Sequence, residues 1–245
     1  MSPVASQLTS VPLAQRSTPS LFSLEGQTVI VTGGGRGLGL TIAQAVLESG
    51  GHVAAVDVLP EPAPDEWQRA REIAANKHLS LSYQHLDVTD RDAVHSVFGK
   101  IFASAPREAP VKGLFCSAGI QMLVPALEYT PEQIRKIIDV NLTGTFLCAQ
   151  AFASEFGKHN PGPNAQETPS ASQQDASGRP GAEPVTGLAG EGGGSIVMTG
   201  SMSGHVANFG LECAAYNASK AGVNQLAKNF AMEWGPMGIR VNVSR

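Results

Sequence analysis

A regular alternation of short apolar segments with segments of helical periodicity constrains the fold of this chain more than any other feature, and it begins at Gln27. Such alternation is typical of parallel strands joined by crossover helices. It predicts an α/β protein with a doubly wound parallel sheet in a three-layer α/β/α arrangement. The expected strands lie in the segments TVIVTG, HVAAVDV, LSYQHLDV, VKGLFCSAG, GSIVMTGS and GIRVNVS.

The segments between these strands show where helices begin and which side they bury. Thr130, Pro131 and Gln133 supply an N-cap, a proline at the first helical position and a capping-box partner, so a helix is expected to begin near Pro131. Two other predicted helices carry apolar residues at helical spacing, namely Val94, Val97, Phe98 and Ile101 in one and Val223, Leu226, Phe230 and Trp234 in the other.

The alternation fails in two segments. Residues 1–24 are rich in Ser, Thr and Pro, with one Arg and no acidic residue, and we expect a disordered tail there, with a mitochondrial transit peptide as the alternative. Residues 161–193 contain almost no large apolar side chain, and they cannot bury enough surface to offset the entropy lost on ordering. They are expected to form a flexible insertion in a single domain over residues 25–245.

Charge and composition argue against several classes of function. The net charge is −4 without a basic block, so no nucleic-acid partner is expected. No apolar run reaches the roughly 18 residues that span a bilayer, and the N-terminus does not resemble a secretory signal, so we expect a soluble protein with no membrane partner. Cys116, Cys148 and Cys213 form no CxxC pair, which favours free thiols in the cytoplasm over a zinc site or disulfides.

A glycine-rich segment, TGGGRGLG at residues 32–39, joins the first predicted strand to the apolar helical segment LTIAQAVL. A phosphate-binding turn needs glycines where the backbone approaches a pyrophosphate, and a helix N-terminus whose N–H groups face the anion. Gly33, Gly37 and Gly39 meet this need, although their GxxxGxG spacing departs from GxGxxG. The segment predicts dinucleotide binding to a Rossmann-type sheet, with a simple tight turn as the alternative.

Asp57 ends the second predicted strand, eighteen positions after Gly39. An acid near this offset binds the adenosine ribose hydroxyls and repels a 2′-phosphate, which favours NAD. Arg36 in the glycine-rich turn acts in the opposite sense, because a guanidinium pairs with phosphate. We expect NAD as the cofactor, with NADP as the alternative. A solvated carboxylate without a ligand is the other interpretation of Asp57.

Two further strand ends offer small or polar groups to a dinucleotide. Asp87, in LDVTD, is expected to contact the adenine edge through its side chain or through the following backbone at Val88; a helix cap for the segment from Thr89 onward is the alternative. The CSAG turn after the fourth strand contains Ala118 and Gly119, and a ring can lie against backbone at such small residues.

Tyr216 and Lys220, in YNASK, are four residues apart, so both side chains project from one face of a helix. A phenol has an ordinary pKa of about 10, and a nearby ammonium stabilises the phenolate, which suits the pair to proton exchange. Taken alone, the pair is better explained as two residues on an exposed helix surface. Ser201 changes this balance, because it ends the fifth predicted strand at the edge where ligands bind and is expected to hydrogen-bond a reacting oxygen.

Asn141, in DVNLTGTF, is an amide within an apolar helical segment. We expect it to be buried and to anchor a water that carries the proton outward from Lys220.

Together these motifs resemble the classical short-chain dehydrogenase/reductase family, in the order in which that family carries them. The likeness covers about residues 25–244 apart from 161–193, and within the family it is strongest to fungal polyol dehydrogenases and ketose reductases. The resemblance implies an NAD(P)-dependent oxidoreductase that interconverts a secondary alcohol, of a polyol or a secondary metabolite, with a ketone by hydride transfer. It implies no metal, and it implies a small-molecule substrate and a homo-oligomer as partners.

The resemblance also assigns residues. The implied catalytic residues are Asn141, Ser201, Tyr216 and Lys220, with Tyr216 as acid and base. The implied cofactor contacts come from the glycine-rich turn, the strand ends and the catalytic helix: Gly33, Arg36, Gly37, Leu38, Gly39, Asp57, Asp87, Val88, Ala118, Gly119, Asn141, Tyr216 and Lys220.

Three features depart from the family pattern. Ser117 stands where the family has asparagine, and the interval from Ser201 to Tyr216 is fifteen instead of thirteen residues, which makes Ser203 the alternative to Ser201. The chain stops at Arg245, where the family continues into a Pro-Gly turn, a substrate-covering loop and a last strand. We therefore expect a sheet that lacks its last strand, and the alternative function is a truncated, non-catalytic dinucleotide-binding or interaction protein.

Overall fold

A computed structural model describes residues 21–160 and 193–244 of the chain. The predicted disordered tail over residues 1–24 lies outside the described residues except for its last four positions. The predicted flexible insertion over residues 161–193 lies outside them except for its last position. Both therefore stay predictions.

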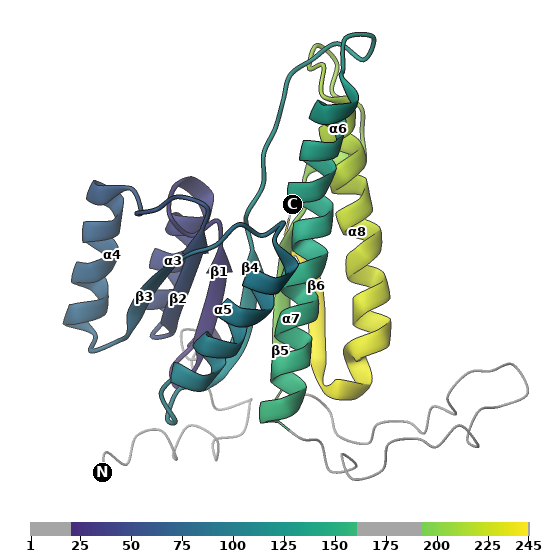
Figure 1. Ribbon diagram of the computed structural model, residues 1–245. Coiled ribbons are helices and arrows are strands. Elements are labelled where there is room, and N and C mark those ends of the chain that lie inside the picture. The colour runs from purple at the N-terminus through teal and green to yellow at the C-terminus, as the bar shows by residue number, and fades with distance from the viewer. Residues whose placement is uncertain (1–20, 161–192, 245) are drawn as a thin grey trace, which may run out of the picture.

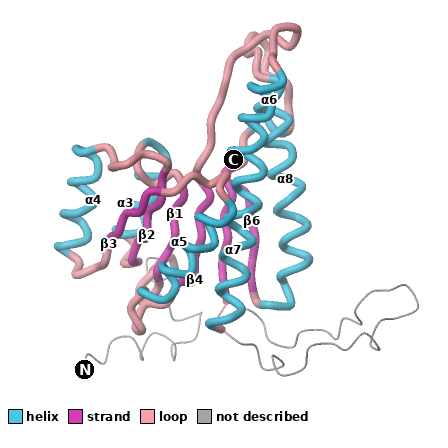
Figure 2. Tube along the Cα trace, in the orientation of Figure 1, coloured by secondary structure: helices cyan, strands magenta, loops and turns pink. Residues whose placement is uncertain are grey.

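The described residues form one parallel sheet of six strands in the order β3-β2-β1-β4-β5-β6 (Figure 2). Each strand is joined to the next along the chain through a helical segment, and the order reverses between β1 and β4, which opens a crevice at the carboxyl ends of these strands. The predicted Rossmann-type α/β fold is thus confirmed. The strands are β1 Thr28–Thr32, β2 His52–Asp57, β3 Leu81–His85, β4 Val111–Cys116, β5 Gly194–Thr199 and β6 Ile239–Ser244.

Helices cover both faces of this sheet (Figure 1). On one face lie α3 Gly37–Glu48 and α4 Pro64–Asn76, and on the other lie α5 Arg91–Ser104, α7 Gly144–His159 and α8 Ala214–Trp234. A shorter helix, α6 Pro131–Ile138, runs through a π-helical turn, η3 Asp139–Thr143, directly into α7. Two short 3-10 turns, η4 Met202–Gly204 and η5 Gly235–Met237, flank α8.

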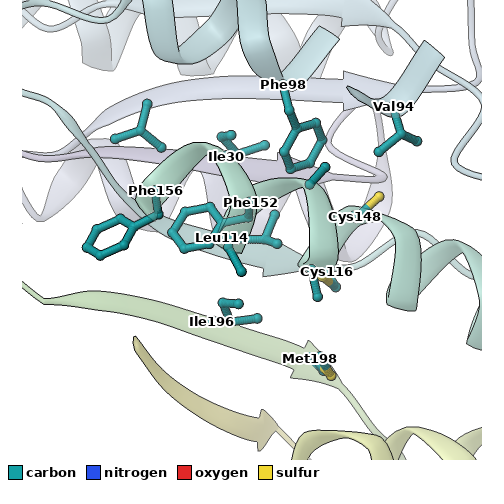
Figure 3. Packing of buried hydrophobic residues seen from close by; sticks show 14 of the residues in the cluster. Ile30, Val94, Phe98, Leu114, Cys116, Cys148, Phe152, Phe156, Ile196 and Met198 are labelled. Carbon is teal, nitrogen blue, oxygen red and sulfur yellow. The ribbon is translucent and has the colours of Figure 1, made fainter. Parts of the chain in front are cut away.

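The core has one apolar layer on each side of the sheet. The larger layer packs β-strand residues such as Leu114 and Ile196 against Phe98 of α5 and Phe152 of α7 (Figure 3). The smaller layer packs β1 and β2 against α3 and α4, with Leu40 fully enclosed. Burying each such side chain stabilises the fold by about 1.5–3 kcal/mol, so these layers hold the strand ends in a fixed arrangement.

The start of α6 agrees with the sequence prediction, whereas the ends of several strands and the start of α3 differ from it. The capping box is present, since Thr130 Oγ1 accepts from Gln133 N and Gln133 Oε1 accepts from Thr130 N, and α6 begins at Pro131 as predicted. The third strand ends at His85, short of the predicted end at Val88, because its neighbour β2 ends at Asp57 and offers no further ladder partner. Helix α3 begins at Gly37, before the predicted LTIAQAVL segment.

Candidate active site

The carboxyl ends of the parallel strands bring the predicted site residues to one edge of the sheet. The glycine-rich turn follows β1, Asp57 ends β2, and the CSAG turn follows β4. Ser201 follows β5 at the same edge. This common edge is where open α/β sheets bind ligands.

The glycine-rich turn is built so tightly that side chains would not fit. Gly33 has φ +66°, and a Cβ added to it would lie 2.7 Å from the backbone N of Ala118. A Cβ on Gly39 would lie 2.1 Å from the carbonyl oxygen of Gly33. Gly37 has φ +53°, but a Cβ added there would have no heavy atom within 4 Å. Glycine is therefore favoured at this position by the backbone conformation and not by close packing.

The N-terminus of α3 presents its backbone donors at this edge. Its N-cap, Arg36, makes no side-chain hydrogen bond to the helix, so the first N–H groups are not capped by the protein. Arg36, Gly37 and Leu38 are exposed there. A phosphate or pyrophosphate fits such a terminus, because the donors and the helix dipole both favour an anion.

Asp57 is buried and held by the glycine-rich turn, so its interpretation as a solvated strand-end residue is wrong. The side chain is only 7% exposed. Its Oδ2 accepts from Gly35 N at 2.9 Å and its Oδ1 accepts from Leu59 N at 3.1 Å. Burial and the negative charge of Asp57 together raise the pKa of Tyr83 to about 12. The carboxylate thus lies beside the turn with its position fixed by two backbone donors.

Asp87 forms a local turn and does not cap a helix, so the alternative of a cap is wrong. Its Oδ1 accepts from both the N and the Oγ1 of Thr89, at 2.9 and 2.8 Å. The cap of α5 is Asp90, whose Oδ1 accepts from Ala93 N at 3.0 Å. Val88 between these acids is buried and lies against Gly144.

The CSAG turn is anchored to the first strand by a residue that sequence reasoning missed. Thr32 Oγ1 accepts from the N of both Ser117 and Ala118, at 3.2 Å each. Gly119 opens the turn toward two predicted catalytic residues, since a Cβ added there would lie 3.4 Å from Asn141 Oδ1 and 3.8 Å from Lys220 Nζ. The only signal for Thr32 in the sequence is a small hydroxyl directly before the glycines.

Asn141 is fully buried in the π-helical turn η3, as expected for an amide in an apolar helix. Its Oδ1 accepts from Ile120 N at 2.8 Å, and its Nδ2 donates to Ile120 O at 2.9 Å and to Ser219 Oγ at 3.0 Å. The extra residue of a π turn often marks a functional site. The amide joins the loop after β4 to α8, while its own side-chain donors and acceptor are bonded to protein. Ile120 and Ser219 carried no signal in the sequence.

Lys220 lies inside the site, and Tyr216 lies one helical turn before it. The Lys220 side chain is buried, and its Nζ donates to Thr199 O at 2.7 Å and lies 5.7 Å from the centre of the Tyr216 ring. Burial lowers the pKa of Lys220 to about 8, and the nearby Cys116 acts in the opposite sense. The pair is therefore not an exposed helix surface.

Ser201 begins the short turn η4 at the end of β5. It is half-buried in extended backbone, and its Oγ accepts from Ser203 N at 3.1 Å. The loop after β4 and the loop before α8 meet near the first turns of α6 and α8 (Figure 1), and Val124 N donates to Glu212 O at 2.7 Å between them. Exposed apolar side chains of these loops include Leu123 and Phe209.

The described residues contain neither a metal-binding cluster nor a membrane-spanning helix. In the ranges 21–160 and 193–244, no three His, Cys, Asp or Glu side chains gather as a metal site would require. Over the same ranges, no helix combines the length and the apolar character needed to cross a membrane. Cys116, Cys148 and Cys213 are buried free thiols.

Comparison with known proteins gives a consistent match over most of the chain. The model of the short chain dehydrogenase family matches residues 27–163 and 183–244. "Short chain dehydrogenases/reductase notP'" of Aspergillus versicolor is 37% identical over 219 residues, which are 89% of this chain and 64% of that protein. The ribulose-forming D-arabinitol 2-dehydrogenase of Candida tropicalis is 32% identical over 229 residues, with 90% of this chain and 70% of that protein covered.

A solved structure shows the same architecture. The putative NAD(P)-dependent gluconate 5-dehydrogenase of Beutenbergia cavernae, a structure with bound NADP, superposes with a TM-score of 0.66 at 26% identity. The match covers 91% of this chain and 72% of that one. The chain thus spans 64% to 72% of the length of these relatives.

Proposed function

Because the chain belongs to the short-chain dehydrogenase family, we propose that it interconverts a secondary alcohol and a ketone with a nicotinamide dinucleotide as cofactor. The observation that carries this proposal is the grouping of half-buried Tyr216 with buried Lys220 and Asn141 at the carboxyl edge of a Rossmann-type sheet. A nicotinamide, when bound, supplies the hydride acceptor or donor at its ring.

Tyr216 exchanges a proton with the substrate oxygen in the proposed reaction. The Lys220 ammonium lies near the phenol ring and stabilises the phenolate form. Ser201 donates a hydrogen bond to the reacting oxygen and stabilises the charge that develops there. Asn141 positions Ile120 and Ser219 around this group, and because these two residues already occupy its side-chain donors and acceptor, we assign it this positioning role and no water.

The dinucleotide site is proposed at the glycine-rich turn. Gly33 and Gly39 let the turn pack closely on itself and on the CSAG turn, and the open space beside Gly37, together with the uncapped N-terminus of α3, suits a pyrophosphate. Leu38, Val88, Ala118 and Gly119 are proposed to line the rest of the cofactor path. We propose NAD as the preferred form, because the buried Asp57 carboxylate suits two ribose hydroxyls and repels a 2′-phosphate.

The proposed substrates are polyols and ketoses or the hydroxyls of secondary metabolites. The arabinitol dehydrogenase relative supports the first class, and the exposed Leu123 and Phe209 on the loops beside the site suit the second. Oxidation and reduction assays on both classes, with NAD(H) and NADP(H), would separate them.

The decisive experiment combines binding and turnover on the purified chain. NADH and NADPH binding is followed by fluorescence, and turnover is measured on ketoses, polyols and apolar ketones. We expect Tyr216→Phe to lower kcat at least about 100-fold while the dissociation constant for NADH changes less than about threefold, because only the proton-transfer group is lost. Full turnover in Tyr216→Phe would show that another group is the acid and base. Binding without any turnover by the unmodified chain would refute the enzymatic proposal.

A further inference from the structure

Asn224 extends the face of α8 that carries Tyr216 and Lys220, because the three residues follow one another at intervals of four. Its half-buried side chain lies against the turn formed by residues 200–205, which carries Ser201. No role for Asn224 follows from the motifs of the chain.

The Asn224 amide is wedged between the two glycines of that turn. A Cβ added to Gly200 would lie 3.1 Å from Asn224 Oδ1, and a Cβ added to Gly204 would lie 2.7 Å from Asn224 Nδ2. Asn224 Nδ2 and His205 Nε2 are 3.0 Å apart and form a hydrogen bond. The amide therefore contacts the turn both before and after Ser201.

The two ends of the turn are attached differently. At its start, Gly200 N donates to Ser244 O at 2.9 Å and Lys220 Nζ donates to the carbonyl of Thr199 at 2.7 Å. At its end, Gly204 lies directly on the backbone of Lys220, where an added Cβ would be 2.9 Å from the Lys220 carbonyl oxygen. The hydrogen bond from Asn224 to His205 holds this end in contact with the helix.

The hydroxyl of Ser201 depends on this arrangement. Its Oγ accepts from Ser203 N, and its carbonyl accepts from Gly204 N at 3.0 Å, so its orientation follows that of η4. A shift of η4 away from α8 would move Ser201 relative to Tyr216, which lies on the same helix two turns before Asn224. Displacements of about 1 Å at a reacting centre can reduce rates by about 100-fold.

We propose that Asn224 is a positioning residue that ties the Ser201 turn to the catalytic helix and so sets the distance between the Ser201 hydroxyl and the Tyr216 phenol. The inference rests on the proposed function, since it concerns the same reaction. Asn224 contacts neither reacting group; it acts through Gly204 and His205.

The test compares Asn224→Ala with Asn229→Ala, the same substitution at an exposed position of the same helix. The assay uses whichever of the ketoses, polyols and apolar ketones is turned over fastest by the unmodified chain. We expect Asn224→Ala to lower kcat about tenfold, with KM and NADH affinity changed less than about twofold. Asn229→Ala is expected to leave all three unchanged. In a Ser201→Ala background, Asn224→Ala should lower kcat less than about twofold further, because its effect passes through Ser201.

The outcomes separate this inference from the proposed function. Independent, multiplicative losses in the double variant, or full kcat in Asn224→Ala, would overturn the positioning role while leaving the reaction intact. Absence of turnover in the unmodified chain would refute the reaction itself. Hydrogen exchange provides a readout without turnover: the amides of residues 200–205 should exchange faster in Asn224→Ala and not in Asn229→Ala. Unchanged exchange there would also overturn the inference, and a normal melting temperature shows that the variant is folded.

Discussion

Gly33 and Gly37 share a positive φ but differ in their surroundings, which makes them a matched pair. Replacing either with alanine costs about 1–2 kcal/mol for a left-handed conformation. Gly33→Ala also forces a Cβ against the backbone of Ala118, whereas Gly37→Ala meets open space. We therefore expect Gly33→Ala to lower the free energy of unfolding by a further ~1–3 kcal/mol in urea denaturation. Equal losses of unfolding free energy in Gly33→Ala and Gly37→Ala would mean that the glycine-rich turn and the CSAG turn are not in close contact.

The preference for NAD over NADP is also expected to depend on a single residue, Asp57. Asp57→Asn removes the negative charge but keeps an oxygen that can accept from Gly35 or Leu59. We expect the ratio of NADPH to NADH affinity to rise at least about tenfold, since the repulsion of a 2′-phosphate is removed. Asp65→Asn, at an exposed position in the first turn of α4, is the matched control and should leave the ratio unchanged. If the ratio of NADPH to NADH affinity stays constant in Asp57→Asn, then Arg36 or another group, and not Asp57, discriminates between the two cofactors.

Among the elements, those fixed by local chemistry were predictable and those fixed by distant contacts were not. The start of α6 follows from Thr130 and Gln133, which lie within one turn. The end of β3 depends instead on the length of its neighbour β2, and the π turn around Asn141 contains an amide bonded to a loop 21 residues earlier. The local sequence around a residue does not show which distant segments that residue will contact.

The candidate site shows the same division. Parallel strand topology predicts that all strand ends meet at one edge, so Asp57, Ser201 and Tyr216 could be brought together from the sequence. Thr32 and Asn224 could not, because each acts on backbone that is distant along the chain or packs in a way that only the fold determines. Residue type suggested Asp87 as a possible helix cap, and the structure has Asp90 in that role instead.

At the scale of the whole molecule, the buried Lys220 couples folding to pH. Its pKa falls from 10.5 in the unfolded chain to about 8 in the folded one. Below pH 8 both states hold the proton, and the cost of burying the charge is fully present. Between pH 8 and 10.5 the folded state releases the proton while the unfolded state keeps it, so this group makes the protein more stable as pH rises. Cys116 and Tyr83 act oppositely at higher pH, because burial raises the pKa of each to about 12.

Comparison with Lys220→Met isolates this coupling. The free energy of unfolding is measured in urea for both proteins between pH 7 and 9.5. The opposing effect of the buried thiols begins near pH 9 in both proteins and cancels when the two are subtracted. The difference, wild type minus variant, should be constant up to about pH 8 and then rise by about 2 kcal/mol to pH 9.5. Lys228→Met, an exposed lysine on the same helix, should give a constant difference across the window. Parallel curves for wild type and Lys220→Met would mean that the Lys220 ammonium is solvated in the folded protein. The burial of Lys220 beside Tyr216, on which the proposed chemistry depends, would then be refuted.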